Sequence, residues 1–272
     1  MSLPEERRRQ LLYGDWDAGV GLALPQLDED VHFVRPFEPP AHWIQFGGFD
    51  WGFAHNWVYV WCAVSEDGDI VVLDTVKGRQ ELPDEIARKI RTRTRLERVK
   101  YVAAGRDCWH VHRARGENTP TIAEWLIGAG IPLIKANTDP VHGLNNLRDY
   151  TAWRARGPRG EDTDPALFFM DTPGNRWLFE QCASMVTDPD DPEKALKVDA
   201  DPETGEGGDD GYDALRYAVA SRPPRPRSIW AEEQIRAWDP TVLEHEAKES
   251  RRVRTPRPVD EDLDPMLMVS LS

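Results

Sequence analysis

The pattern of hydrophobic positions changes at residue 43, where three β-forming runs follow one another. These runs are residues 43–50, 57–64 and 69–76. Short glycine-containing stretches separate them, so the three runs are predicted to form an antiparallel meander. In the next segment, residues 82–96, the apolar positions Ile86 and Ile90 have helical spacing and there is no internal glycine. This segment is predicted to be the first helix.

Predicted helices and strands alternate from residue 99 to residue 220. The strands are residues 99–104, 131–135 and 166–170, and the helices are residues 119–129 (capped by Thr119), 144–153, 174–185 and 212–220. Alternation of this kind indicates parallel strands joined by helical crossovers. The whole order predicts an α/β fold with a mixed sheet, an antiparallel meander plus parallel strands, flanked by helices. A ribonuclease H-like domain has this order of elements.

Segments of different character flank this pattern on both sides. Five prolines interrupt residues 1–42, which show no sustained period and are interpreted as an irregular lead-in. Residues 222–272 are charged and contain proline, with one plausible helix at 229–238, and they are interpreted as a mobile tail. The expected organisation is therefore a lead-in, an α/β domain over residues 43–221, and a C-terminal tail.

The composition indicates a globular protein that stays inside the cell. The 272 residues are 40% hydrophobic, which is enough for one well-buried core. No run approaches the roughly 20 apolar residues that cross a bilayer, and no apolar region near the N-terminus is typical of a secretion signal. We therefore expect no membrane contact. Cys62, Cys108 and Cys182 lack a Cys-x-x-Cys spacing, which argues against a disulfide framework and a structural zinc site.

The net charge bears on whether the protein binds DNA. A formal charge of −14 is unusual for that function, because phosphate contacts normally require a basic surface. The charge is, however, unevenly distributed: acidic residues concentrate in 188–210 and 260–264, whereas residues 91–115 are locally basic. Divalent cations also let an acidic protein grip DNA. The net charge therefore counts against DNA binding without excluding it.

Aspartates lie at the ends of the elements that converge in a ribonuclease H-like fold. Asp50 ends the first strand, Asp107 follows the strand at 99–104, and Asp210 and Asp213 open the last helix. Hard divalent cations prefer carboxylate oxygens, and two ions about 3.5–4 Å apart can bracket the attacking and leaving oxygens of a phosphodiester. The pattern therefore predicts two divalent cations, bridged by Asp50 and completed by the other three aspartates.

Each of these aspartates also has a purely structural interpretation. Asp50 can simply end a strand at a turn, where Gly52 is expected to let the backbone turn tightly. Asp210 and Asp213 can cap a helix and interact with its dipole without any metal. Asp209 is interpreted as a cap or a solvated neighbour rather than as a ligand.

The histidines near Asp107 and the acidic stretch before the last helix can each be interpreted in two ways. His110 and His112 flank Trp109, but no partner Cys or His pair lies at a spacing that suits zinc; one of them can instead contact DNA. The acidic stretch 188–208 is interpreted as a solvated flexible loop. The sharper alternative is a regulatory hairpin that screens the site from DNA.

Two motifs resemble the large subunits of phage terminases. The opening Arg7-Arg-Arg-Gln-Leu-Leu-Tyr-Gly-Asp-Trp-Asp17 resembles the end of the packaging ATPase. The closing Gly208-Asp-Asp-Gly-Tyr-Asp-Ala-Leu-Arg-Tyr217 resembles the aspartate-bearing helix of the nuclease. Phe49-Asp-Trp-Gly52 lies between them, so the resemblance runs from residue 7 to residue 221.

This resemblance implies a metal-dependent endonuclease that cuts concatemeric double-stranded viral DNA into genome lengths. The catalytic acids would be Asp50, Asp107 and Asp213, holding Mg²⁺ or Mn²⁺. It also implies a packaging ATPase, a small terminase subunit and a capsid portal as partners, and the cytoplasm of a bacterial host as the location. The chain departs from the family at two positions: related sequences often have histidine in place of Asp210 and an acid in place of Asn56.

The sequence contains no Gly-x-x-x-x-Gly-Lys-Ser/Thr phosphate loop. We therefore expect either that the chain is a separate gene product or fragment, or that another polypeptide supplies the packaging motor. Two rival functions stay open. Another ribonuclease H-like nuclease, such as a junction resolvase or a transposase catalytic domain, would share the acid cluster, whereas a non-enzymatic packaging adaptor would not cleave DNA.

Overall fold

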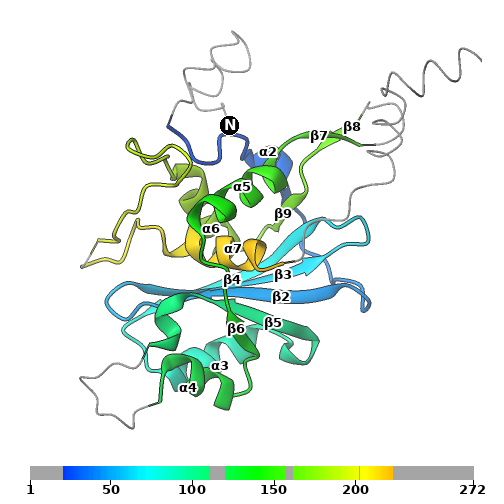
Figure 1. Cartoon of the computed structure of the whole chain (residues 1–272). Coiled ribbons are helices and arrows are strands. Elements are labelled where there is room, and N and C mark those ends of the chain that lie inside the picture. Colours follow the sequence, from blue (N-terminus) through cyan, green and yellow to red (C-terminus); the bar gives the residue numbers. More distant parts are fainter. Residues whose placement is uncertain (1–20, 111–119, 157–161, 202, 223–272) are drawn as a thin grey trace, which may run out of the picture. The chain divides into compact units, whose positions relative to one another are not determined.

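A seven-stranded mixed sheet forms the centre of the domain (Figure 1). The computed structural model describes residues 21–110, 120–156, 162–201 and 203–222. The strands lie in the order β1-β9-β4-β3-β2-β5-β6. Their bounds are Phe33–Val34 (β1), Ile44–Asp50 (β2), Asn56–Val64 (β3), Ile70–Arg79 (β4), Val99–Ala104 (β5), Leu133–Lys135 (β6) and Leu167–Met170 (β9).

The predicted meander and the predicted parallel strands are both confirmed. Strand β3 pairs antiparallel with β2 and with β4. Strand β5 lies parallel to β2, β6 lies parallel to β5, and β9 lies parallel to β4. The chain therefore forms a mixed α/β sheet of the ribonuclease H-like kind, in which β2, the strand that carries Asp50, lies between β3 and β5.

Helices cover both faces of this sheet, and a separate hydrophobic core lies under each layer (Figure 1). Because side chains alternate along a strand, Val58 and Val60 enter one core while Trp57 and Tyr59 enter the other. Within the described residues, none of the helices is long and apolar enough to cross a membrane. The helices are Pro83–Arg93 (α3) and Ile122–Gly128 (α4) on one face, and Pro140–Thr151 (α5), Pro173–Ser184 (α6) and Asp210–Ala220 (α7) on the other.

Helix α7 packs directly on β2 and β3 and is buried along its whole length. The approach is closest at Gly48, where an added Cβ atom would lie 1.9 Å from the backbone oxygen of Ala214. Only glycine permits this separation, because it has no Cβ. The contact places the start of α7 beside the end of β2.

Two helices begin three or four residues away from their predicted starts, because local capping fixes where they begin. Helix α4 begins after Thr121, whose side chain forms a reciprocal capping box with Glu124; the predicted cap, Thr119, lies outside the described residues. Helix α5 begins at Pro140 rather than at residue 144, since the Asp139 side chain accepts a hydrogen bond from the backbone N–H of His142.

Several short elements were not predicted at all. Within the expected irregular lead-in, Glu29–His32 (α2) leads into β1, which pairs parallel with β9, and the neighbouring Leu24 and Leu27 belong to a hydrophobic core. The fold also contains two 3₁₀ turns, Leu96–Arg98 (η2) and Arg106–Trp109 (η3). Strands Arg154–Arg156 (β7) and Asp162–Asp164 (β8) form a separate two-stranded sheet, and a β-bridge joins Thr187 to Ala195. The motif at residues 7–17 and the helix predicted at 229–238 lie outside the described residues.

Candidate active site

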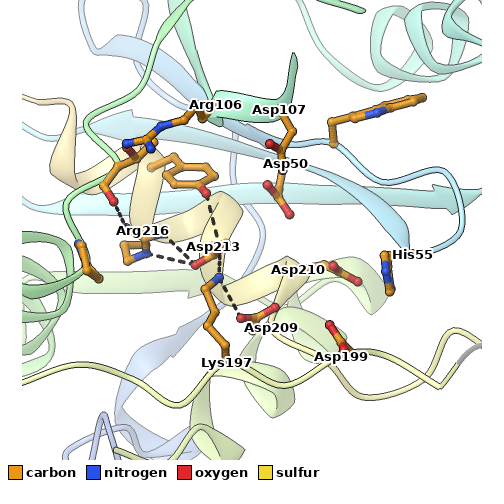
Figure 2. A pocket seen from close by; sticks show the side chains of 14 residues that line it. Asp50, His55, Arg106, Asp107, Lys197, Asp199, Asp209, Asp210, Asp213 and Arg216 are labelled. Carbon is orange, nitrogen blue, oxygen red and sulfur yellow. Dashed lines mark hydrogen bonds and ion pairs between the residues drawn. The ribbon is translucent and has the colours of Figure 1, made fainter. Parts of the chain in front are cut away.

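A polar cavity of about 530 Å³ opens where β2, η3 and α7 meet. It contains all four aspartates that the sequence predicted as ligands, together with three cationic or aromatic groups from α7 and from the segment that precedes it (Figure 2). The lining residues are Asp50, Trp51, His55, Arg106, Asp107, Thr138, Pro140, Lys197, Asp199, Asp209, Asp210, Asp213, Arg216 and Tyr217.

Asp50 lies at the end of β2, and its carboxylate points toward those of α7 (Figure 2). Burial raises the pKa of Asp50 well above its ordinary value, and the charges of Asp213 and Asp210 raise it further. Gly52 follows in the turn between β2 and β3, where an added Cβ would lie 2.5 Å from the backbone oxygen of Asn56. The tight turn expected at Gly52 is therefore present.

Asp210 and Asp213 lie one turn apart on α7, so both face the cavity. Asp210 accepts hydrogen bonds from the backbone N–H of Asn56 (3.3 Å) and from its side-chain Nδ2 (3.4 Å). Burial raises the pKa of Asp210, while these hydrogen bonds act in the opposite direction. Asn56 and Asp210, the two positions at which the chain departs from the pattern of the sequences it resembles, are therefore neighbours. The carboxylate of Asp210 is stabilised by the hydrogen bonds that Asn56 donates.

Asp213 is held by three side chains. Its Oδ1 accepts hydrogen bonds from Arg216 Nε (3.0 Å) and Nη2 (2.9 Å), so both guanidinium donors converge on one carboxylate oxygen. Its Oδ2 accepts one from Tyr217 (3.4 Å) and one from the ammonium of Lys197. Arg216 and Asp213 have side chains only 4% and 6% exposed, so this pair is fully enclosed.

Asp209 differs from its predicted role. It occupies the N-cap position of α7, but its side chain forms no capping hydrogen bond and is only 15% exposed. Its carboxylate instead pairs with Lys197 at 2.8 Å. Burial raises the pKa of Asp209, as does the charge of Asp213. Asp209 is therefore neither a side-chain cap nor a solvated neighbour, because it faces the same cavity as the predicted ligands.

Asp107 lines the cavity from η3 but lies at its rim. Its side chain is 78% exposed and lies 3.7 Å from the side chain of His110. The groups that raise the pKa of Asp50 are Asp213, Asp210 and Asp209, not Asp107. The structure thus brings Asp50, Asp210 and Asp213 together and leaves Asp107 facing solvent, while the second predicted histidine, His112, lies outside the described residues.

The donor set of the cavity suits a hard divalent cation. Four carboxylates converge, and burial together with their mutual repulsion raises the pKa of Asp50 and of Asp209; a bound cation would relieve the repulsion. The ammonium of Lys197 already occupies such a position, between Asp209 and Asp213. Across the described ranges, no three His, Cys, Asp or Glu side chains are close enough together to ligate one ion. Holding an ion therefore requires the carboxylates to move toward it.

Among the solved structures to which this chain is similar in fold are large terminases. The P22 large terminase nuclease domain matches with a TM-score of 0.52 and 18% identity, over 72% of this chain and 89% of that one. The chain has the fold of a large terminase nuclease domain. The large terminase of the thermophilic bacteriophage D6E matches with a TM-score of 0.53 and 16% identity, over 81% of this chain.

The chain spans about half, 53%, of the length of that D6E terminase. No protein-family model matches the chain, and no curated protein matches it. At these sequence identities the likeness establishes the fold, and the chemistry has to be argued from the side chains of this chain.

Sequence reasoning missed the cations of the site. Arg216 belongs to the motif at residues 208–217, but nothing in its spacing showed that it would hold Asp213. Lys197 lies in the stretch 188–208, which was interpreted as a solvated loop because it is rich in acidic residues. Lys194 is the only other lysine in this stretch. A lysine inside an acidic run that precedes an aspartate-bearing helix was the available signal. The acidic stretch is also not simply a solvated loop, because it has bridges at Thr187 and Ala200.

Proposed function

We propose that this chain is a metal-dependent DNA endonuclease of the terminase type. The observation that carries the proposal is the convergence of Asp50, from the end of β2, with Asp210 and Asp213, from the start of α7, on one cavity. A structural role does not explain why Asp50 and the buried Asp210 face the buried Asp213, because carboxylates of like charge that face one another are destabilising where no cation offsets them.

In the proposed reaction, Asp50, Asp210 and Asp213 hold the divalent ions, and Asp107 contributes from the rim. Bound Mg²⁺ or Mn²⁺ would activate a water molecule and neutralise charge on the leaving oxygen of the phosphodiester. The protein supplies the geometry: β2 fixes Asp50, and the contacts of Arg216 with Oδ1 and of Lys197 and Tyr217 with Oδ2 orient the carboxylate of Asp213.

Arg106 adds a positive charge beside this cluster. It lines the cavity and donates a hydrogen bond to the Thr138 hydroxyl at 3.1 Å, an exposed contact that a phosphate oxygen can replace. The chain thus offers acids for the ions and a guanidinium for the DNA backbone. A site of this kind reads phosphates rather than bases, so we expect cleavage with little sequence preference.

The biological setting follows from the fold likeness and the motif resemblance. We propose that the substrate is concatemeric double-stranded viral DNA, cut to genome length in the cytoplasm of a bacterial host. A packaging ATPase, a small terminase subunit and a capsid portal would be the partners. The D6E terminase, which is about twice as long as the matched region, supports an association with further domains.

The test is cleavage of supercoiled plasmid by the purified chain with Mn²⁺. We expect nicking and linearisation by the wild type, loss of both in Asp50→Asn and in Asp213→Asn, and a weaker loss in Asp107→Asn. Asp171→Asn is the matched control, because Asp171 is exposed, pairs with Arg176 at the surface and does not line the cavity. Full activity of Asp50→Asn would reject the proposed role of that residue.

The same preparation separates the rival functions. A non-enzymatic packaging adaptor leaves the plasmid intact with either ion, and its Asp50→Asn variant behaves as the wild type does. A resolvase-type enzyme cleaves a four-way junction in strong preference to linear duplex of the same sequence. A terminase-type nuclease cleaves both duplexes without preference for the junction.

A further inference from the structure

Lys197 reaches the aspartate cluster from a segment, residues 186–208, that is anchored on both sides of it. On one side, Leu196 donates a backbone hydrogen bond to Val186 at 2.8 Å. On the other, Ala200 is buried and bridged to Gly207, and the Asn56 side chain donates to Gly205 at 2.6 Å. Within the described residues, positions 197–199 between these anchors form no backbone–backbone hydrogen bond.

The Lys197 ammonium bridges two enclosed carboxylates while its own side chain is 65% exposed (Figure 2). It contacts Asp209 and Asp213, whose side chains are 15% and 6% exposed. Burial works against its charge, but the two carboxylates outweigh burial and raise the pKa of Lys197. The Lys197 ammonium thus contacts the aspartate cluster, while most of its side chain is exposed to solvent, so that the side chain can leave the cluster.

The other half of the cluster has no such partner. Among the described residues, no cationic side chain forms an ion pair with Asp50 or Asp210. The second lysine of the segment, Lys194, pairs with Asp191 at 2.6 Å, and neither of them lines the cavity. The cation that this segment supplies to the cluster is therefore specific to position 197 and is not a general property of the segment.

We infer that Lys197 is a tethered cation that occupies the Asp209–Asp213 side of the proposed metal centre and must withdraw before a divalent ion binds there. This inference rests on the proposed function. It follows that the two ions bind unequally: on the Asp50–Asp210 side no cationic side chain among the described residues forms an ion pair, whereas the ion on the Asp213 side displaces an ammonium. Lys197 is a positioning residue in this scheme, because it acts on the ligands and not on the substrate.

The first test measures ion binding without any cleavage. Mn²⁺ is titrated calorimetrically into the full metal-free chain, for the wild type and for Lys197→Met. We expect two classes of site in the wild type, and in Lys197→Met the weaker class binds about fivefold more tightly, the equivalent of roughly 1 kcal/mol of ion-pair free energy. Lys194→Met is the matched control and keeps wild-type affinities, while Lys197→Arg keeps the competing charge and the wild-type weak site.

The second test uses thermal unfolding, which needs no bound substrate. In EDTA, Lys197→Met leaves Asp209 and Asp213 without their shared cation, so its Tm falls below that of the wild type by about 2–4 °C. Saturating Mn²⁺ replaces the missing charge and removes or reverses this difference. Lys194→Met shows no such dependence on the ion.

The outcomes separate this inference from the function on which it rests. If the wild type binds Mn²⁺ and Lys197→Met binds its weaker ion no more tightly, the tethered-cation role is wrong while the nuclease proposal stands. If the wild type binds no Mn²⁺ at all, the proposed metal centre is itself rejected, and the inference with it.

Discussion

The contact between Gly48 and α7 allows a test that touches no ligand. In Gly48→Ala, the new methyl group would lie 1.9 Å from the backbone oxygen of Ala214 and 2.9 Å from Cβ of Ala218. Protein Cβ atoms essentially never approach other heavy atoms within 3.0 Å, so the deficit is at least 3.0 − 1.9 = 1.1 Å. The blocking atom is backbone, and only movement of the helix relieves the clash.

This displacement sets both the stability and the activity of the variant. Overpacking of a well-packed core costs about 1–3 kcal/mol, and we expect a loss of that size in the free energy of unfolding. The moved helix carries Asp210 and Asp213, so their distance from Asp50 changes by about 1 Å. A misplacement of about 1 Å in a catalytic group lowers rates by on the order of 10²-fold.

Urea unfolding, Mn²⁺ calorimetry and plasmid cleavage measure the three consequences. The matched control is Gly128→Ala, because an added Cβ there meets nothing within 4 Å and alanine favours the helix by up to about 1 kcal/mol. Truncating Ala218 to glycine in the Gly48→Ala background should not restore function, since the Ala214 oxygen still blocks. Wild-type stability and wild-type cleavage in Gly48→Ala would refute the reasoning.

Three further changes probe the electrostatics of the cavity. Burial and neighbouring acids raise the pKa of Asp50, so the folded state binds its proton more tightly than the unfolded state does. The stability of the protein therefore falls as pH rises from about 4 toward that raised pKa. In EDTA, Asp50→Asn should unfold at a higher urea concentration than the wild type near neutral pH, and at an equal concentration near pH 4. Arg216→Met leaves the enclosed Asp213 charge short of a partner and should cost about 3–5 kcal/mol in urea unfolding, with Mn²⁺ binding weakened as well; a cost below about 1 kcal/mol would contradict the assigned contact. Asn56→Asp sets a carboxylate against Asp210 and removes a buried donor, at a cost of about 1–3 kcal/mol that Asp210→His should partly recover; strictly additive effects in the double-mutant cycle would exclude the coupling.

The sequence predicted the sheet and its helices because their signals are local. The runs of β-branched and aromatic residues in β2, β3 and β4, and the helical spacing in α3, each involve residues that are close together in the sequence. Strand β1 has only two residues, and its parallel partner β9 lies far along the chain. A pairing of this length has no periodicity to detect, so it became visible only in three dimensions.

Some residues of the candidate site could likewise be predicted from the sequence, and others could not. Asp50, Asp210 and Asp213 were predictable because each lies at the end of a strong element, and the fold brings those ends together. Asp107 follows β5 as predicted, but its 3₁₀ turn leaves it at the rim. Lys197 was unpredictable in detail, since its position depends on bridges and side-chain contacts that pin an otherwise irregular segment.

The edge strands of the central sheet affect how this domain can associate with other molecules. Its two outermost strands, β1 and β6, contain two and three residues. An unpaired strand edge is a template on which another chain can add hydrogen bonds, and very short edge strands are one way in which proteins prevent this. We therefore expect sheet-to-sheet polymerisation to be disfavoured, so that molecules which bind this domain would do so through side chains on its helical layers or around the cavity mouth.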